Sequence, residues 1–226
     1  MPESASGKSL IPVYMMPGMA ANPSIFEHVK LPEDRYEVIW LHWKLPREKE
    51  TLVHYAQRMC KEVKHKNPVL MGVSFGGILV QEMSKLIPVR KLIVISSVKC
   101  RDELPYSMRV ARKTYLHKLL PTSLVNNVEV LAKYAFGESV VKRLKLYERY
   151  LSVRDKRYLD WAIDQVVNWE QEKPIPGTIH IQGDRDPVFP ADRIKDCIWI
   201  KGGTHIMIIN RFKWFNEHLP ELISGK

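Results

Sequence analysis

The chain has 226 residues, 45% of them hydrophobic, and carries 35 Lys and Arg against 25 Asp and Glu, a formal net charge of +10. This length supports one substantial hydrophobic core, so we expect a single domain over residues 1–226. No stretch reaches 18 uninterrupted apolar residues, which argues against a membrane span. No nucleic-acid-binding motif accompanies the positive charge, so we expect no nucleic-acid partner.

The start of the chain and its cysteines indicate a cellular compartment. Residues 1–10 are polar and lack the apolar core of a secretory signal, which predicts an intracellular, cytoplasmic protein. Cys60, Cys100 and Cys197 form no C-x-x-C pair and no metal-ligand spacing with histidine. We therefore expect reduced structural thiols and no metal site.

The predicted elements alternate between strands and helices as far as residue 97. In chain order they are strands at 11–16 and 36–43, a helix at 48–66, a strand at 68–73, a helix at 75–86 and a strand at 89–97. The first helix is amphipathic, because its apolar residues recur at helical spacing. This alternation predicts an α/β fold, with a mostly parallel sheet and helices on both faces.

The alternation stops after residue 97 and resumes near residue 178. Residues 99–173 show helical or irregular patterns without a convincing strand, so we interpret them as an insertion. Residues 99–157 hold 14 Lys and Arg against 6 Asp and Glu. Strands at 178–182 and 197–201 and a last helix at 206–223 complete the predicted elements.

A G-x-S-x-G motif lies where the strand at 68–73 meets the following helix. Gly72, Ser74 and Gly76 are its fixed positions. A serine on such a sharp turn exposes its hydroxyl above the sheet, and the glycines let the neighbouring backbones approach. The motif predicts a nucleophile elbow with Ser74 as the nucleophile.

Two further motifs follow in the order that this chemistry requires. Asp184 and Asp186 follow the strand at 178–182, and His205 follows a pair of glycines after the strand at 197–201. A serine hydroxyl is a weak nucleophile unless a base lies beside it, and histidine with an orienting acid supplies that base. From position alone, either aspartate fits the role of the acid.

Together these motifs make the chain similar to the α/β-hydrolases, in which the triad follows the chain order Ser, Asp, His. The resemblance covers the chain from about residue 11 to the last helix. It implies the α/β-hydrolase fold, with residues 99–173 as a helical cap over the active site. It also favours Asp186 as the acid, because the spacing of Gly183, Asp186 and Pro190 matches the acid loop of that family, which leaves Asp184 to brace the loop.

The resemblance also implies an oxyanion hole made of two backbone N–H groups. One belongs to Phe75, and the other to Met19, after Gly18 at the end of the first strand. Many relatives have a histidine before this glycine, whereas this chain has Pro17. Proline has no N–H and no side-chain hydrogen bond, so we expect this loop to be held differently.

The substrate pocket is less clearly marked than the triad. Phe26, Tyr106, Phe189 and Met207 are candidate walls because they lie next to motif residues, but each also fits a plain core position. His42 and Trp43 end the second predicted strand, where they can reach a substrate. His180 lies inside a predicted strand, where a structural role is expected.

The sequence as a whole predicts a serine hydrolase, of carboxylesterase or thioesterase type, that cleaves a small ester or thioester through an acyl-enzyme. The basic insertion favours an anionic substrate or carrier, although a solvated helix surface explains the same charge. An acyltransferase, a lyase and a non-catalytic ligand-binding protein stay open as alternatives, because the fold hosts all of them. No dinucleotide-binding or phosphate-binding loop is present, and we expect no cofactor.

Overall fold

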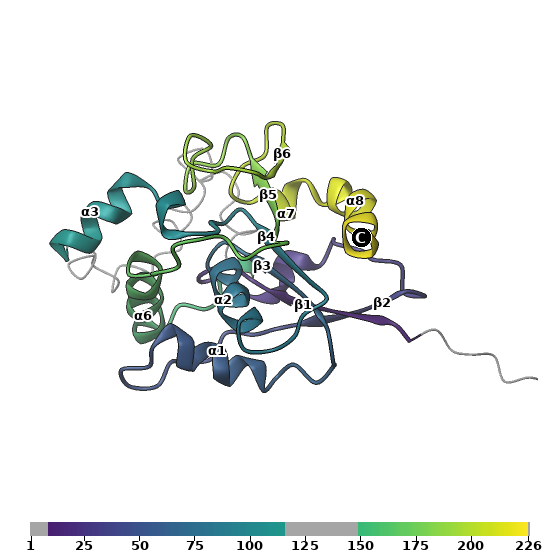
Figure 1. Ribbon diagram of the computed structural model, residues 1–226, viewed down its shortest axis with the longest axis horizontal. Coiled ribbons are helices and arrows are strands. Elements are labelled where there is room, and N and C mark those ends of the chain that lie inside the picture. The colour runs from purple at the N-terminus through teal and green to yellow at the C-terminus, as the bar shows by residue number, and fades with distance from the viewer. Residues whose placement is uncertain (1–8, 116–148, 226) are drawn as a thin grey trace, which may run out of the picture.

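A computed structural model describes residues 9–115 and 149–225 of the chain (Figure 1). Six strands form one sheet: β1 (Ile11–Met16), β2 (Tyr36–Trp40), β3 (Val69–Val73), β4 (Lys91–Ile95), β5 (Ile179–Gly183) and β6 (Ile198–Ile200). Their order is β2-β1-β3-β4-β5-β6, and every pairing is parallel. The predicted α/β class with a parallel sheet is confirmed.

The central strands are apolar because both faces of the sheet are covered. All five residues of β3 are buried, as are the last four of β1 and of β4. The register pairs Met16 with Gly72, and Val73 with Ile95. The carboxyl ends of these strands therefore lie side by side, so the segments that follow them meet at one edge of the sheet.

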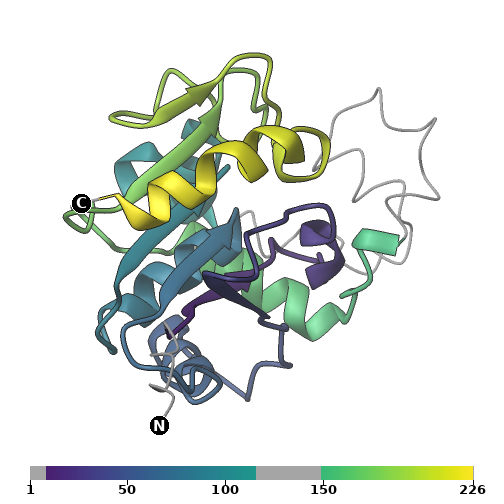
Figure 2. The same cartoon turned by 90° about the vertical axis from the view of Figure 1, so that its right-hand side faces the viewer.

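Helices cover both faces of the sheet. The connections through α1 (Leu52–Cys60) and α2 (Phe75–Ser84) both cross the sheet toward β4, so right-handed crossovers place these helices on the same face. The connection from β1 to β2 runs the opposite way and carries the 3₁₀ helix η1 (Pro23–Phe26) on the other face. Helix α7 (Met207–Asn210) contacts η1, and Figure 2 shows α8 (Phe212–Ser224) in front of the sheet.

Several predicted elements were wrong in their bounds. The second strand ends at Trp40 rather than at residue 43. Helix α1 starts only after Thr51, whose extended backbone and hydroxyl cap the first turn through the N–H of His54. The single C-terminal helix expected at 206–223 is two helices, because the backbone at Arg211 leaves the helical region with φ at −118°.

Part of the predicted cap is described. It contains the 3₁₀ helix η2 (Arg101–Glu103), α3 (Tyr106–Thr114) and α6 (Lys156–Val167). Helix α6 contacts both α2 and α3. The rest of the expected cap, residues 116–148, lies outside the described residues. Across the part of the chain that is described, no helix is long and apolar enough to cross a membrane.

Candidate active site

The turn between β3 and α2 holds Ser74 in a strained conformation. Its φ of 53° and ψ of −122° lie where residues other than glycine are rare. A Cβ atom at Gly72 would lie 2.3 Å from the carbonyl oxygen of Gly76, and one at Gly76 would lie 2.3 Å from that of Pro17. Only glycine fits at both positions, which explains the spacing of the motif.

Two other contacts fix the elbow to the neighbouring strand. The Ser74 N–H donates to the Ile95 carbonyl at 2.9 Å, at the end of β4. The hydroxyl of Ser97 donates to the Ser74 carbonyl at 2.8 Å. These bonds satisfy the backbone of Ser74 and leave its side chain for contacts above the sheet edge.

The structure brings Ser74, His205 and Asp186 together at this edge. The Nε2 atom of His205 lies 3.0 Å from the Ser74 Oγ, and its Nδ1 atom lies 2.9 Å from the Asp186 Oδ2. Asp186 and His205 are both buried. With Nδ1–H donating to the carboxylate, the unprotonated Nε2 can accept the serine proton, which is the arrangement that activates a hydroxyl.

Asp186 is held as a carboxylate by hydrogen-bond donors. The N–H groups of Val188 and Phe189 donate to its Oδ1 at 2.8 and 3.1 Å. Burial by itself would raise the pKa of Asp186, but the charge and hydrogen bond of His205 and the two backbone donors outweigh it. The pKa of this carboxyl therefore lies below its ordinary value, and the group is ionised at neutral pH.

Behind Asp186, strand β5 supplies a second buried polar side chain that the sequence reasoning missed. Gln182 is fully buried, and its amide donates to the Asp186 Oδ2 at 3.0 Å and to the Phe189 carbonyl at 2.9 Å. The Gln182 Oε1 lies 3.3 Å from the Nε2 of His180, whose pKa burial lowers to about 4. Because the amide oxygen can only accept, the tautomer of neutral His180 with its proton on Nε2 donates to Gln182. In the sequence, the signal for this role was that two polar residues, His180 and Gln182, alternate within an apolar strand and so share one face of the sheet.

The neighbouring aspartate makes different contacts. The Oδ1 of Asp184 accepts from the Gly202 N–H at 2.6 Å, which joins the loop after β5 to the loop after β6. These loops are packed tightly, because a Cβ atom at Gly183 would lie 2.3 Å from the carbonyl oxygen of Gly203. Asp184 therefore braces the two loops that carry Asp186 and His205.

The loop after β1 passes beside Ser74. A Cβ atom at Gly18 would lie 3.3 Å from that of Ser74. The Gly18 carbonyl accepts from the Ala21 N–H at 3.1 Å and from the Trp43 Nε1 at 2.8 Å. Within the described part of the chain, neither the Met19 nor the Phe75 N–H donates to a backbone carbonyl outside the regular elements. Met19 follows Gly18, and Phe75 follows Ser74. The two amides proposed for the oxyanion hole therefore both lie next to Ser74, and no such carbonyl among the described residues occupies them.

Residues 149–153, which belong to the predicted cap, also contact this loop. The Val153 N–H donates to the Ala20 carbonyl at 3.0 Å, and the Asn22 N–H donates to the Tyr150 carbonyl at 2.8 Å. The Asn22 side chain adds a 2.8 Å hydrogen bond to the Ser152 hydroxyl. The loop is therefore fixed from the predicted cap as well as from the core.

Comparison with known proteins finds similarity in structure but not in sequence. No protein-family model matches the sequence, and no curated protein matches it significantly. Solved structures do match: a hydrolase from Pseudomonas aeruginosa superposes with a TM-score of 0.72 at 11% identity, covering 96% of this chain and 91% of that one. An α/β-hydrolase-fold protein from Burkholderia ambifaria gives 0.67 at 14% identity, covering 96% and 91%.

The chain has the α/β-hydrolase fold. An esterase from Exiguobacterium antarcticum shares the architecture, with a TM-score of 0.65 at 20% identity over 96% of this chain and 93% of that one. These identities establish the fold. A shared fold does not specify an activity or a substrate.

Within this α/β-hydrolase fold, the expected pocket residues lie in different surroundings. Phe26 and Met207 are fully buried in the core. Phe189 is buried too, and its ring lies edge-on to that of His205, with the ring centroids 5.6 Å apart. Tyr106 is exposed at the start of α3. The structure thus places Phe189 beside His205 and Tyr106 on the exposed surface of α3, while their contact with a substrate stays a prediction.

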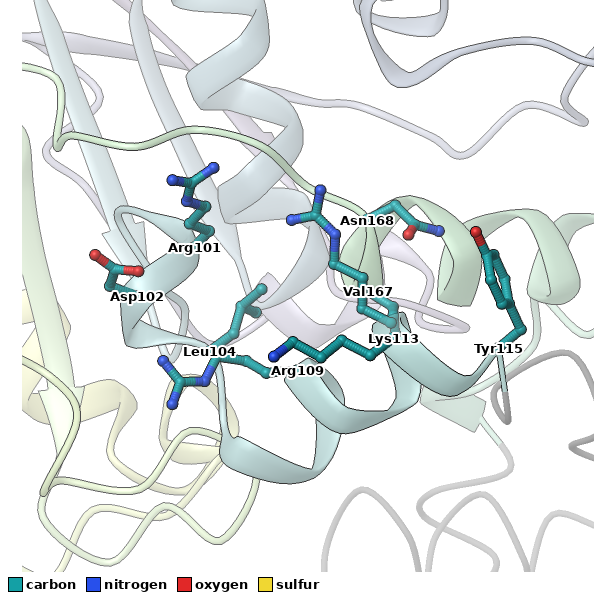
Figure 3. A pocket seen from close by; sticks show the side chains of 9 residues that line it. Arg101, Asp102, Leu104, Arg109, Lys113, Tyr115, Val167 and Asn168 are labelled. Carbon is teal, nitrogen blue, oxygen red and sulfur yellow. The ribbon is translucent and has the colours of Figure 1, made fainter.

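A cavity of about 540 Å³ lies elsewhere, between η2, α3 and the end of α6 (Figure 3). Its lining includes four cations and one acid: Arg101, Arg109, Arg112, Lys113 and Asp102. The cavity borders the end of α6 at Val167 and Asn168. The next residue, Trp169, donates to Glu82, which lies near the end of α2 that is distant from Ser74. We therefore do not assign this cavity to the substrate of Ser74.

Other reactive side chains are poorly suited to catalysis. Burial raises the pKa of the Cys60 and Cys197 thiols to about 11, and it raises that of Cys100 as well, so all three stay protonated at neutral pH. Among residues 9–115 and 149–225, no three His, Cys, Asp or Glu side chains gather as metal ligands. Ser74 is therefore the nucleophile that the described residues support best.

Proposed function

We propose that this protein is a serine hydrolase that cleaves small esters or thioesters through an acyl-enzyme. One observation carries the proposal: the Ser74 hydroxyl lies 3.0 Å from the His205 Nε2, and the other ring nitrogen of His205 lies 2.9 Å from the Asp186 carboxylate. The names of the structural neighbours, a hydrolase and an esterase among them, support the same reaction class.

In the proposed reaction, the Ser74 Oγ attacks the acyl carbon while His205 takes the hydroxyl proton. The negative charge that develops on the carbonyl oxygen is stabilised by the N–H groups of Met19 and Phe75. The imidazolium then gives its proton to the leaving alcohol or thiol, and an acyl-enzyme remains on Ser74. A water molecule repeats the cycle: His205 removes its proton, and the acid leaves as the serine regains a proton.

The role of Asp186 follows from its surroundings. Its lowered pKa keeps it ionised, so that it holds the Nδ1–H tautomer of His205 and stabilises the imidazolium formed in each half-reaction. Residues 1–226 then act as one catalytic domain with the 99–173 insertion as its cap. A preference for anionic substrates stays a prediction, because the basic cavity of the cap does not border Ser74.

The experiment is hydrolysis of p-nitrophenyl butyrate and of a butyryl thioester by wild type, Ser74→Ala and Ser84→Ala. Ser84 lies at the other end of α2, so its variant is a matched control for losing a serine hydroxyl. We expect Ser74→Ala to abolish turnover and Ser84→Ala to keep it. Turnover by Ser74→Ala would contradict the proposal. Butyryl transfer to an added alcohol, in preference to water, would indicate an acyltransferase instead.

A further inference from the structure

One side chain contacts both segments that carry the proposed oxyanion donors. Trp43 lies three residues beyond the end of β2 and is partly buried. Its indole N–H donates to the Gly18 carbonyl at 2.8 Å. Its ring stacks on that of Phe75, with centroids 5.0 Å apart and planes 7° apart. From these contacts we infer that Trp43 is a positioning residue for the oxyanion hole, an inference that rests on the proposed function.

The hydrogen bond acts on the peptide that contains the first donor. The carbonyl of Gly18 and the N–H of Met19 belong to one peptide unit, and the described chain has no cis peptide bond. In a trans unit the two groups point in opposite directions. Holding the carbonyl toward Trp43 therefore directs the Met19 N–H away from the indole. A hydrogen bond to the carbonyl also polarises the unit, which makes the N–H a stronger donor.

The hydrogen bonds from residues 149–153 reach this loop further along, at Ala20 and Asn22, and none of them acts on the Gly18–Met19 peptide. Pro17 has no N–H, so it cannot anchor the turn from inside. The Ala21 N–H reaches the same Gly18 carbonyl at 3.1 Å, but that bond joins two residues of the same turn and moves with it. The indole comes from a separate segment that is itself packed against the core. It therefore ties the turn to the body of the protein.

The ring of Trp43 also contacts the side chain of Phe75, the residue that carries the second proposed donor. Phe75 is the first residue of α2, and its backbone N–H lies at the elbow. The ring of Tyr158, on helix α6 of the predicted cap, has its centroid 5.3 Å from that of Trp43, and the ring of Tyr55 on α1 has its centroid 6.1 Å away. The indole thus packs against side chains of α1 and α6 while it contacts Gly18 and Phe75. It therefore links the Gly18–Met19 peptide to the residue at the start of α2.

A second tryptophan in the same aromatic cluster provides a matched control. The Trp161 ring lies 5.7 Å from that of Phe75, but its indole N–H donates to the Glu50 carbonyl at 2.6 Å, away from the loop at Gly18. Trp161→Phe removes an indole hydrogen bond of the same kind and leaves Gly18 untouched. A general loss of packing or stability should therefore affect both variants alike.

The test compares kcat and KM for p-nitrophenyl butyrate in wild type, Trp43→Phe and Trp161→Phe. Phenylalanine at position 43 keeps a ring that can pack against Phe75, removes the N–H donor and is smaller than the indole. Trp161→Phe makes the same reduction in size, so the comparison isolates the bond to Gly18. We expect kcat to fall about 3- to 10-fold in Trp43→Phe, the effect of one lost hydrogen bond, with KM within about twofold of wild type. Affinity for a trifluoromethyl ketone, which forms a tetrahedral serine adduct, should fall by the same factor. Equal losses in both variants, or a change in KM alone, would overturn the inference.

An NMR measurement tests whether Trp43 orients the Gly18–Met19 peptide, even if the wild type hydrolyses no ester. We expect Trp43→Phe to shift the Met19 amide resonance and to speed its hydrogen exchange, whereas Trp161→Phe leaves both as in wild type. An unchanged Met19 amide in Trp43→Phe would overturn the inference. Inactivity of the wild type together with a shifted Met19 amide would instead reject the proposed function and leave the role of Trp43 in holding this peptide established.

Discussion

The two sides of the candidate site are built differently. On the triad side, Ser74 and the loops of Asp186 and His205 depend on close backbone packing between glycines, at Gly72 and Gly76 and at Gly183 and Gly203. On the oxyanion side, the loop after β1 also packs against Gly76 through the Pro17 carbonyl, but its Gly18 carbonyl is bonded to a side chain from elsewhere in the chain. Trp43 holds it from 25 residues away, and residues 149–153 of the predicted cap hold it from the far half of the chain.

This difference shows which contacts fix the catalytic groups on each side of the site. Backbone packing between glycines is encoded within a few residues, so it appears in the sequence as short motifs. A loop that is held by distant side chains leaves no motif of its own. We therefore expect substitutions on the triad side to abolish chemistry, and substitutions of the supports to reduce it in a graded way.

The largest effect expected on the triad side separates the two aspartates. Asp186→Asn removes the charge that orients His205 and should lower kcat by about 10⁴-fold. Asp184→Asn keeps a hydrogen-bond acceptor for the Gly202 N–H and should cost less than about tenfold. Steady-state kinetics on both variants checks this, and equal mild losses would reject Asp186 as the acid.

A smaller effect is expected from the support behind Asp186. Gln182→Met removes both amide donors from the buried site, so we expect kcat to fall about 10-fold and stability by roughly 1–3 kcal/mol. Gln81→Met is the control, because Gln81 is also fully buried and donates to two carbonyls on α2 and after β4. If both variants lose stability and kcat equally, Gln182 has no special role in orienting Asp186.

Acid should weaken the fold through Asp186. The pKa of this group is lowered in the folded state from an ordinary value of 3.8, so its stabilising contribution is complete above that value. The contribution is lost as pH falls through the lower, folded-state pKa. The gap in unfolding free energy between wild type and Asp186→Asn should therefore narrow from about pH 5 downward. Urea unfolding at several pH values measures it, and a gap that widens in acid would contradict the assigned direction.

The smallest effect concerns strain at the elbow. Ser74→Gly and Ser74→Ala both remove the nucleophile, but only glycine relaxes a φ of 53°. We expect Ser74→Gly to be about 1 kcal/mol more stable than Ser74→Ala. Thermal unfolding of the two variants compares them directly. Equal melting temperatures would mean that the turn stores no strain.

Much of the fold was predictable because a buried parallel sheet produces apolar runs and regular alternation. The sequence also predicted which three strand ends would carry Ser74, Asp186 and His205, and the structure places those side chains within hydrogen-bond distance. Gln182 was missed, since a polar residue inside a strand does not reveal which acid it faces. The part of Trp43 in holding Gly18 needed the path of the chain beyond β2, which no local pattern encodes.

The central claim is that Ser74 is an activated nucleophile. Intact-mass analysis after treatment with a fluorophosphonate probe tests it without knowledge of the substrate, using wild type, Ser74→Ala and Ser84→Ala. The account predicts one adduct on wild type and on Ser84→Ala, mapped to Ser74 by peptide analysis, and none on Ser74→Ala. A folded wild type that acquires no adduct, or one that maps to another residue, would contradict it.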